Sequence, residues 1–548
     1  MERVSPVRGT SFGSRKIMTI KVLTAGLTED AVEKNIHELV SDKVASRIFG
    51  KDSTLWGDEA EAESSIRLGW VHSALDSEPL VEKILALREE FKSKGVNRFV
   101  LCGMGGSSLA PEVITATFGV ELTVLDSTNP EQVASALVEL ERTAIIVSSK
   151  SGSTVETDSQ KRVFEQAFAD AGIDKTDRIV IVTDPGSPME AAAKTDGYRV
   201  FNADPTVGGR YSALTAFGLV PSGLAGADIQ TLVNDAKRAA EALASDEVTN
   251  PGLVLGAAMA STASSRSIKN KLVIAEAGTE IHGFGDWAEQ LIAESTGKDG
   301  KGILPVVAGL SSPEVTESFD DVLVARVVSD ALTSEADQLV VSGSLGEQFL
   351  LWEVATVVAS RIIGINPFDQ PDVESAKIAA RAMLTSRDEA TEPNFTESGI
   401  EVRAIGFDLK ATDIRSAIAE ILSNVPSNGY VALHAYLDRI SNPAFSELRD
   451  IVASTSERPT TFGWGPRFLH STGQFHKGGP AVGVFIQLVS KAQTDLAVPG
   501  RDFTFGELIA SQAAGDAKVL ADHQRPVLTI TFEDNETALK LIKSSLEK

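Results

Sequence analysis

Cysteine is almost absent from this sequence of 548 residues, because Cys102 is the only one. A single cysteine excludes an intrachain disulfide and a cysteine-based metal site, which fits a reducing cytoplasm. We expect Cys102 to be a small buried residue at a strand end rather than a reactive thiol. Basic residues are also few: 51 lysines and arginines stand against 76 acids, and the formal net charge is −25. This excess of negative charge argues against nucleic acid or an anionic membrane as a partner.

Long apolar runs are absent too. No stretch approaches the roughly 20 residues that a membrane-spanning helix needs, and no secretory hydrophobic segment is present. Residues 1–17 hold four basic residues and one acid, and Met18 follows them directly. A transit peptide is conceivable there, but we expect a disordered tail or a translation start at Met18 instead. The whole pattern predicts a cytoplasmic protein without a membrane partner.

Short apolar runs of β type alternate with helix-like stretches from residue 97 onward. This alternation is typical of βαβ units and of a parallel, doubly wound sheet. Strand candidates in the first block are residues 99–102, 121–125, 144–147 and 178–182. The chain before this block is mostly helical in pattern, with amphipathic runs at 30–44 and 79–93.

We therefore expect an α/β protein of four parts. These are a mostly helical N-terminal segment (1–95), a first α/β domain (96–240), a second one (241–390) and a C-terminal α/β extension (391–548). The second domain shows helix candidates at 252–265, from 287, at 349–363 and at 375–384, and strand candidates at 271–275, 322–328 and 338–341. The extension shows strand candidates at 429–435, 481–488 and 527–531. The residues themselves show no internal repeat, and a structural duplication of the two domains stays open.

Two loops carry the clearest functional signal. The first is Gly-Met-Gly-Gly-Ser-Ser at 103–108, and the second is Ser-Ser-Lys-Ser-Gly-Ser-Thr at 148–154. Each follows a predicted strand and precedes a helix-like stretch, so both fall at the carboxyl edge of one sheet. Glycines allow a ligand close to the backbone, and helix-start N–H groups with hydroxyls around Lys150 suit a phosphate monoester. Neither loop is a P-loop or a full dinucleotide fingerprint, and an ordinary tight or solvated turn stays open for each.

Four further segments place reactive side chains beside glycines or in a helix-like run. Gly208 and Gly209 precede Arg210, whose guanidinium suits an oxyanion, and Glu294 ends a helix before Ser-Thr-Gly-Lys-Asp-Gly-Lys-Gly. Lys377 follows Asn-Pro-Phe-Asp-Gln-Pro, and residues 470–479 supply two histidines and a glycine pair. Taken singly, each has an ordinary explanation, such as an ion pair, a solvated acid or a core histidine.

In combination these segments resemble the glucose-6-phosphate isomerase family. The resembling motifs extend from Gly103 to Pro480, and the nearest likeness is the isomerase half of bacterial transaldolase–isomerase fusions. The resemblance implies two doubly wound sugar-isomerase (SIS) domains and an enzyme that interconverts glucose 6-phosphate and fructose 6-phosphate in glycolysis and gluconeogenesis. It implies neither a metal nor a cofactor, with a hexose 6-phosphate as substrate. It also implies a homodimer whose histidine is donated across the subunit interface.

The resemblance further implies roles for individual residues. Glu294 is the base that moves a proton between C1 and C2, Arg210 stabilises the enediolate, and Lys377 and His470 open the sugar ring. The histidine usually precedes the lysine in this family, whereas His470 follows it here, so His476 and His282 stay open as alternatives. The phosphate contacts are Gly105, Gly106, Ser107, Ser149, Lys150, Ser151 and Thr154, and the other substrate contacts are Gly209, Gln290 and Gln370.

Two other functions stay open. One is a relaxed isomerase that also accepts mannose 6-phosphate, with Thr296 or Gln290 as the residue near the base that decides it. The other is a non-catalytic SIS sensor that binds a sugar phosphate and regulates a partner. Such modules can lose the base, whereas Glu294, Arg210 and Lys377 are all present here.

Overall fold

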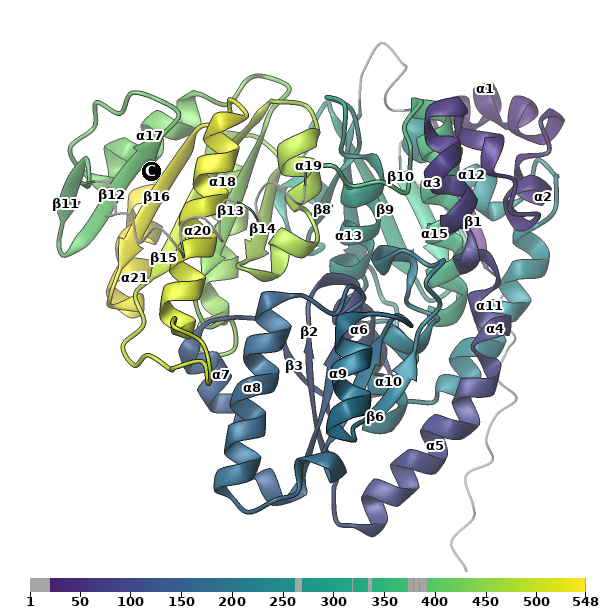
Figure 1. The fold of residues 1–548 in the computed structure, drawn as a ribbon. Coiled ribbons are helices and arrows are strands. Elements are labelled where there is room, and N and C mark those ends of the chain that lie inside the picture. The colour runs from purple at the N-terminus through teal and green to yellow at the C-terminus, as the bar shows by residue number, and fades with distance from the viewer. Residues whose placement is uncertain are drawn as a thin grey trace, which may run out of the picture.

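Three β-sheets and the helices around them form the frame of the molecule (Figure 1). The structure, a computed structural model, describes residues 20–261, 269–317, 319–333, 338–372, 378, 384 and 392–547. Lys377, residues 1–17 and most of the helix candidate at 375–384 therefore lie outside the described residues. Among those that it does describe, no helix has the length and hydrophobicity to cross a membrane.

The first sheet is entirely parallel, in the order β3-β2-β4-β5-β6. Its strands are β2 (Arg98–Gly103), β3 (Thr123–Leu125), β4 (Thr143–Ser148), β5 (Ile179–Thr183) and β6 (Arg199–Asn202). The four predicted strands are confirmed within two residues at each end, and β6 was missed because this edge strand is only half-buried and lacks an apolar run. Leu101 and Cys102 lie in different hydrophobic clusters, so both faces of the sheet are covered. Cys102 is fully buried on its strand, as expected.

The first sheet and its helices are called the first unit below. The helices are α6 (Leu109–Phe118), α7 (Pro130–Ala136), α8 (Val155–Asp170), α9 (Pro188–Asp196) and α10 (Ala216–Ala225). The helices α6 and α8 start directly after the two glycine- and serine-rich loops. Their free N–H groups therefore point to the carboxyl edge of the sheet, where the sequence predicts a phosphate.

The second sheet has the order β1-β10-β9-β7-β8. Its strands are β1 (Lys21–Thr24), β7 (Lys271–Glu276), β8 (Leu304–Val307), β9 (Val322–Val328) and β10 (Gln338–Ser342). The strand β1 pairs antiparallel with β10, so the N-terminal segment is not purely helical. This sheet and the helices α11 (Ile229–Leu243), α12 (Pro251–Ser261), α13 (Phe284–Thr296), α14 (Pro313–Thr316) and α15 (Leu345–Ile363) form the second unit.

Local backbone features explain why the ends of some helices differ from the predicted ends. The N-terminal helices are α1 (Leu27–Ser41), α2 (Val44–Phe49), α3 (Asp58–Arg67), α4 (Ser73–Asp76) and α5 (Glu78–Ser93). The predicted helix at 30–44 corresponds to α1, which ends at Ser41, and Lys43 with a left-handed φ of 56° separates α1 from α2. The helix α15 starts four residues before its predicted start, because Ser344 and Glu347 form a capping box.

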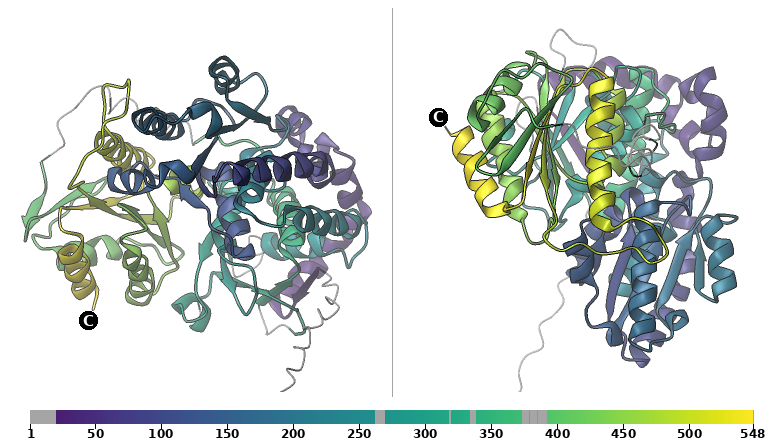
Figure 2. Two further views of the ribbon diagram at one scale, coloured as in Figure 1. Left: turned by 90° about the horizontal axis from the view of Figure 1, so that it is seen from below. Right: turned by 60° about the vertical axis from the view of Figure 1, so that its left-hand side comes forward.

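Residues 392–547, called the C-terminal unit below, form the third sheet in the order β11-β12-β16-β15-β13-β14 (Figure 2). The strands are β11 (Phe395–Glu397), β12 (Ile400–Ile405), β13 (Tyr430–Tyr436), β14 (Thr460–Trp464), β15 (Gly483–Ser490) and β16 (Val527–Phe532). The helices are α17 (Ile414–Ser423), α18 (Leu448–Ser456), α19 (Gly473–Gly478), α20 (Phe505–Asp522) and α21 (Asn535–Leu546). The three predicted strands correspond to β13, β15 and β16.

The three sheets share one arrangement of their parallel strands. The orders β3-β2-β4-β5, β8-β7-β9-β10 and β14-β13-β15-β16 have the same connectivity, which answers the open question of a duplication at the level of topology. In such sheets ligands bind at the carboxyl ends of the strands where the order reverses. In the first unit that point lies between β2 and β4, and the loops that follow these two strands are the predicted phosphate loops. Hydrophobic clusters join the first unit to the second and the second to the C-terminal unit.

Candidate active site

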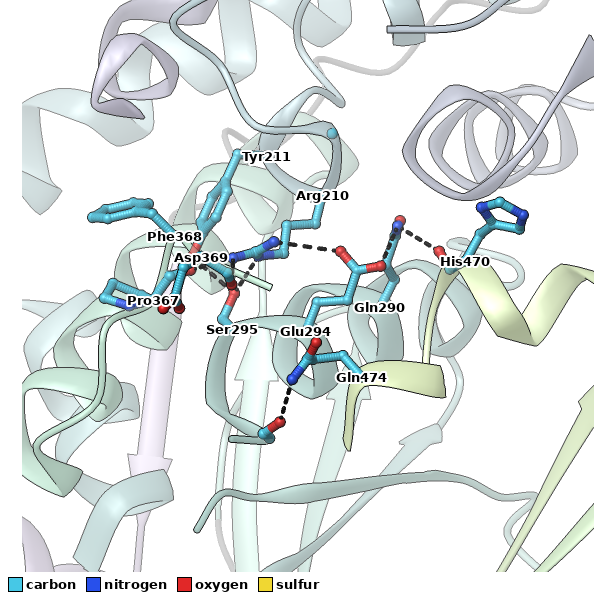
Figure 3. Close-up of polar contacts among 12 residues, drawn as sticks. Arg210, Tyr211, Gln290, Glu294, Ser295, Pro367, Phe368, Asp369, His470 and Gln474 are labelled. Atoms are coloured by element: carbon cyan, nitrogen blue, oxygen red, sulfur yellow. Dashed lines mark hydrogen bonds and ion pairs between the residues drawn. The ribbon is translucent and has the colours of Figure 1, made fainter. Parts of the chain in front are cut away.

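Glu294 and Arg210 form a buried ion pair at the centre of the site (Figure 3). Glu294 lies in the last turn of α13, two residues before the final helical residue Thr296, and only 5% of it is exposed. Its Oε2 is 3.4 Å from Nη1 of Arg210, which lies in the 3₁₀-helix η6 (Gly209–Tyr211). A carboxylate in this water-poor setting can act as a base, and a guanidinium lies beside it.

Backbone and side-chain oxygens fix the guanidinium of Arg210. Its Nε donates to Oγ of Ser295 at 2.9 Å, and its Nη2 donates to the carbonyls of Pro367 at 2.6 Å and Asp369 at 3.1 Å. These contacts satisfy most of the buried donors and leave Nη1 directed to Glu294 (Figure 3). The cation is therefore held in place before any substrate arrives.

Gln290 links Glu294 to the C-terminal unit. Its Nε2 donates to Oε1 of Glu294 at 3.3 Å and to the carbonyl of His470 at 2.7 Å. Its Oε1 is buried and has no hydrogen-bond partner among the described residues, so it is open to a substrate hydroxyl. Thr296 is different, because its hydroxyl donates to the Ile292 carbonyl at 2.8 Å and accepts from the Ile303 N–H at 3.0 Å.

The first glycine loop touches three other segments of the site. A side chain at Gly105 would meet the His470 carbonyl at 2.4 Å and Nε2 of Gln290 at 2.9 Å, and one at Gly106 would meet the Gly209 carbonyl at 2.1 Å. Backbones that approach this closely leave no room for a Cβ atom. The two glycines thus bring the loop against Gln290, η6 and the His470 segment at once.

The second loop forms a compact set of hydroxyls. The hydroxyls of Ser149 and Thr154 lie 2.9 Å apart, and the Gly152 N–H donates to Oγ of Ser149 at 3.2 Å. The ammonium of Lys150 is paired with Oδ2 of Asp184 at 2.5 Å. If Lys150 binds a phosphate, the phosphate must therefore compete with Asp184 for the ammonium group. Nothing in the sequence indicates this ion pair.

His470 lies opposite this second loop. Its Nε2 is 2.9 Å from Oε1 of Glu156, in the first turn of α8. The same Oε1 accepts from Nε2 of Gln512 on α20 at 2.7 Å. The ring points away from Glu294 (Figure 3), so the two side chains do not contact each other's functional groups.

The alternative histidines lie elsewhere. His476 is buried, its Nδ1 is 3.0 Å from the Tyr430 hydroxyl, and burial with the neighbouring His434 lowers the pKa of its imidazole well below the usual value. The side chain of His282 is exposed at the start of α13. Of the three histidines, the structure brings only His470 to the site.

The buried Lys298 binds carbonyls of the loop at residues 366–369, which Arg210 also binds. The Lys298 ammonium donates to the carbonyls of Asn366 and Asp369, each at 2.7 Å, and to Oδ1 of Asp369 at 2.6 Å. Burial and the nearby Arg210 lower the pKa of Lys298 to about 8. Gln370, the residue that follows Asp369, is exposed.

Comparison with known proteins places the chain in a family. A family model described as Phosphoglucose isomerase matches residues 80–302, which include both loops, Arg210 and Glu294. A probable glucose-6-phosphate isomerase of Haloarcula marismortui is 30% identical over 349 residues, which cover 54% of this chain and 79% of that protein. The chain belongs to the phosphoglucose isomerase family.

Two further relatives extend this result. The glucose-6-phosphate isomerase of Rubrobacter xylanophilus is 30% identical, over 54% of this chain and 84% of that protein. The crystal structure of a hypothetical protein from Thermus thermophilus shares the fold, with a TM-score of 0.57 at 24% identity over 67% of this chain and 100% of that one. The predicted family and the predicted α/β fold of sugar-isomerase type are confirmed. The matching family model ends before Lys377 and His470.

Sequence reasoning missed Glu156, which the structure pairs with His470. The two residues are 314 positions apart, and an acid in the first turn of a helix is ordinarily a solvated capping residue. The available signal was its place two residues after Thr154, where α8 starts beside the predicted phosphate site. Glu156 is buried and contacts His470 and Gln512 of the C-terminal unit, and no sequence pattern near Glu156 indicates these partners.

Proposed function

We propose that this chain interconverts glucose 6-phosphate and fructose 6-phosphate through a cis-enediolate. The observation that carries the proposal is the buried contact of 3.4 Å between Glu294 and Arg210 in a member of the phosphoglucose isomerase family. Moving a proton between neighbouring carbons needs one base shielded from water and a fixed cation beside the oxygen that becomes negative. This contact supplies both.

Glu294 takes the proton from C2 of the open-chain aldose. The electron pair of that C–H bond forms the C1–C2 double bond, and the aldehyde π electrons move to O1. Arg210 stabilises the resulting enediolate with the positive charge of its guanidinium. A proton passes from O2 to O1, and Glu294 returns its proton to C1, which gives the ketose without any change in net oxidation state.

The far end of the sugar is held by the two loops of the first unit. We propose that the N–H groups of Gly105 and Gly106 and the hydroxyls of Ser107, Ser149, Ser151 and Thr154 bind the phosphate, with Lys150 nearby. Local donors are needed because the whole chain has a net charge of −25 and repels an anion at long range. Gly209, Gln290 and Gln370 are the proposed contacts to the rest of the substrate.

Ring opening is assigned to His470, oriented by Glu156, together with Lys377, whose role is inferred from the family resemblance alone. A substrate that cannot close its ring tests this role. 5-Deoxyfructose 6-phosphate lacks O5 and stays open-chain, and deuterium exchange at its C1 is visible by NMR. His470→Ala should slow turnover of fructose 6-phosphate by ~10²-fold or more and this exchange by much less. Equal losses on both substrates would contradict the assignment.

The activity itself is tested with fructose 6-phosphate, following glucose 6-phosphate through a coupled dehydrogenase. Glu294→Gln should lower kcat by ~10²–10⁴-fold. Glu289→Gln, on the same helix, is the matched control, because burial and then Asp286 raise the pKa of Glu289 well above its usual value and its Oε1 accepts from the Ser471 hydroxyl rather than facing Arg210. No turnover by the wild-type protein sinks the proposal, whereas full activity of Glu294→Gln sinks only the choice of base.

A relaxed isomerase that also accepts mannose 6-phosphate remains the second candidate. Of its two proposed determinants, Gln290 contacts Glu294 while the hydroxyl of Thr296 is engaged within the loop at the end of α13. Gln290→Thr should therefore change the ratio of mannose to glucose 6-phosphate turnover more than Thr296→Ser does. A cytoplasmic location and a homodimer stay part of the proposal, the latter to be measured by light scattering.

A further inference from the structure

His470 reaches the site from the C-terminal unit of its own chain. It ends the 3₁₀-helix η8 (Arg467–His470), which follows β14 of the third sheet. Its ring contacts Glu156 of the first unit, and its carbonyl contacts Gln290 of the second. His470 of the C-terminal unit thus contacts both other units of the same chain. The family resemblance implies instead that this histidine comes from another subunit.

Arg467 anchors this short helix through ion pairs with three separate elements. Its Nη1 pairs with Oδ2 of the fully buried Asp126 at 2.7 Å and with Glu112 on α6, and its Nη2 lies 3.1 Å from Oδ2 of Asp286 on α13. Arg467 is itself buried and lies one 3₁₀ turn before His470. The arginine that precedes the histidine is therefore tied to the first unit at two points and to the helix of Glu294 at a third.

The charges of this cluster are complementary. Burial alone would raise the pKa of Glu112, but Arg467 and Arg439 lower it to about 2. Arg439, in the loop after β13, pairs with Glu112 at 2.8 Å and with Asp126 at 3.5 Å. Removing Arg467 would leave the fully buried Asp126 without its nearer cation, and breaking a buried ion pair in this way disturbs the surrounding structure strongly.

A second contact orients the partner of His470. Gln512 donates its Nε2 to Oε1 of Glu156 at 2.7 Å and accepts at Oε1 from the Thr128 hydroxyl at 2.6 Å. Gln512 also belongs to the C-terminal unit, on α20. The C-terminal unit thus contributes the histidine and also positions the carboxylate that the histidine meets.

We propose that the C-terminal unit completes the active site of its own chain by supplying His470 in cis. Arg467 is the positioning residue that holds η8 against the other two units. The proposal rests on the isomerase function proposed above. It replaces the implied exchange of histidines between subunits with a site that each chain completes alone. Any homodimer then brings together two independent sites.

Complementation between two inactive chains separates the two arrangements. His470→Ala and Glu294→Gln chains are co-expressed with different tags and purified on both tags. A site completed in trans would restore about half of the wild-type activity in such mixed dimers, because one of their two sites has both groups. A site in cis gives no more activity than the two single variants. If wild-type protein turns over and no doubly tagged species forms, the chain works as a monomer, which also supports the cis site.

The role of Arg467 is tested against its neighbour Arg439. Arg467→Met should slow turnover of fructose 6-phosphate by ~10-fold or more while deuterium exchange into 5-deoxyfructose 6-phosphate stays within ~2-fold, because only the histidine is displaced. Arg439→Met removes a charge from the same carboxylates but is not on η8, so both rates should stay near wild type. Arg467→Lys keeps the positive charge and should recover part of the lost turnover. This variant keeps the proposal testable if Arg467→Met does not fold.

Three results would overturn the proposal. They are activity restored in the mixed dimer, equal losses in Arg467→Met and Arg439→Met, and equal losses of Arg467→Met on the ring-forming and the open-chain substrate. A wild-type chain without isomerase activity would instead refute the proposed function, so the two failures are distinguishable.

Discussion

Gly106→Ala should disable the site by pushing apart two segments that touch through their backbones. The new Cβ would lie 2.1 Å from the Gly209 carbonyl oxygen and 2.4 Å from its carbon, whereas ordinary contact begins near 3.4 Å. Both atoms belong to the backbone of η6, so no side-chain rotation relieves the overlap. The loop or η6 must move by about 1.3 Å, and η6 carries Arg210.

A displacement of about 1 Å in a catalytic group costs on the order of 10²-fold in rate. We therefore expect kcat/KM of Gly106→Ala for fructose 6-phosphate to fall about 100-fold, which corresponds to about 2.7 kcal/mol of transition-state stabilisation. Global stability should fall by about 1–3 kcal/mol, the usual range for overpacking. The coupled dehydrogenase assay and thermal unfolding measure the two effects separately.

Gly208→Ala is the matched control, two residues before Arg210. Gly208 has φ −65°, which any residue adopts, and a Cβ there would meet only Cδ2 of Tyr211, at 3.6 Å. This variant should keep kcat/KM within about 2-fold of wild type. A folded Gly106→Ala protein with wild-type kcat/KM would refute the reasoning, and so would equal losses in the two variants.

Three more predictions follow from the charges of the site. Glu156→Gln should slow turnover of fructose 6-phosphate by ~10-fold or more, with little effect on deuterium exchange into 5-deoxyfructose 6-phosphate, because the His470 ring loses its carboxyl partner. The pKa of Lys298, near 8, predicts a fall in kcat/KM above that pH as the ammonium deprotonates and releases Asp369; the Lys298→Met profile should lack this limb. Against the effect of burial, Arg467 and Arg439 depress the pKa of Glu112 to about 2, so the Glu112 carboxylate stabilises the fold above its usual pKa near 4.5, and this stabilisation is lost as the pH falls toward 2. Between these two pH values the free energy of unfolding should therefore decline less in Glu112→Gln than in the wild-type protein.

The sequence was most informative where the signal is local. The strands of the first unit follow from short apolar runs, and the helix that ends near Glu294 follows from its periodicity and the glycines after it. The edge strand β1 could not be predicted, because β10, the strand with which it pairs, lies about 300 residues away. Its pairing depends on the second unit being folded.

The same limit applies to side-chain partners within the site. Nothing near Lys150 in the sequence shows that Asp184 neutralises it, and nothing near His476 shows that its ring is buried against Tyr430. His470 and His476 are six residues apart in one glycine-rich segment, yet only one reaches the site. The difference comes from the packing of η8 and α19, whose Gln474 donates to the Gly297 carbonyl at the end of α13 (Figure 3).

The shared strand order of the three units explains how one chain can assemble this chemistry. Loops at the carboxyl ends of parallel strands are where α/β proteins place ligand contacts. In the first unit such loops carry the glycines and serines proposed for the phosphate. In the second unit the helix after β7 carries Glu294, and in the C-terminal unit the segment after β14 carries His470. Because Gln290 touches Glu294 and the His470 carbonyl while Gly105 packs against both Gln290 and His470, displacement of one unit disturbs the contributions of all three. We therefore expect ring opening and proton transfer to depend on the same docked arrangement, although they use different residues.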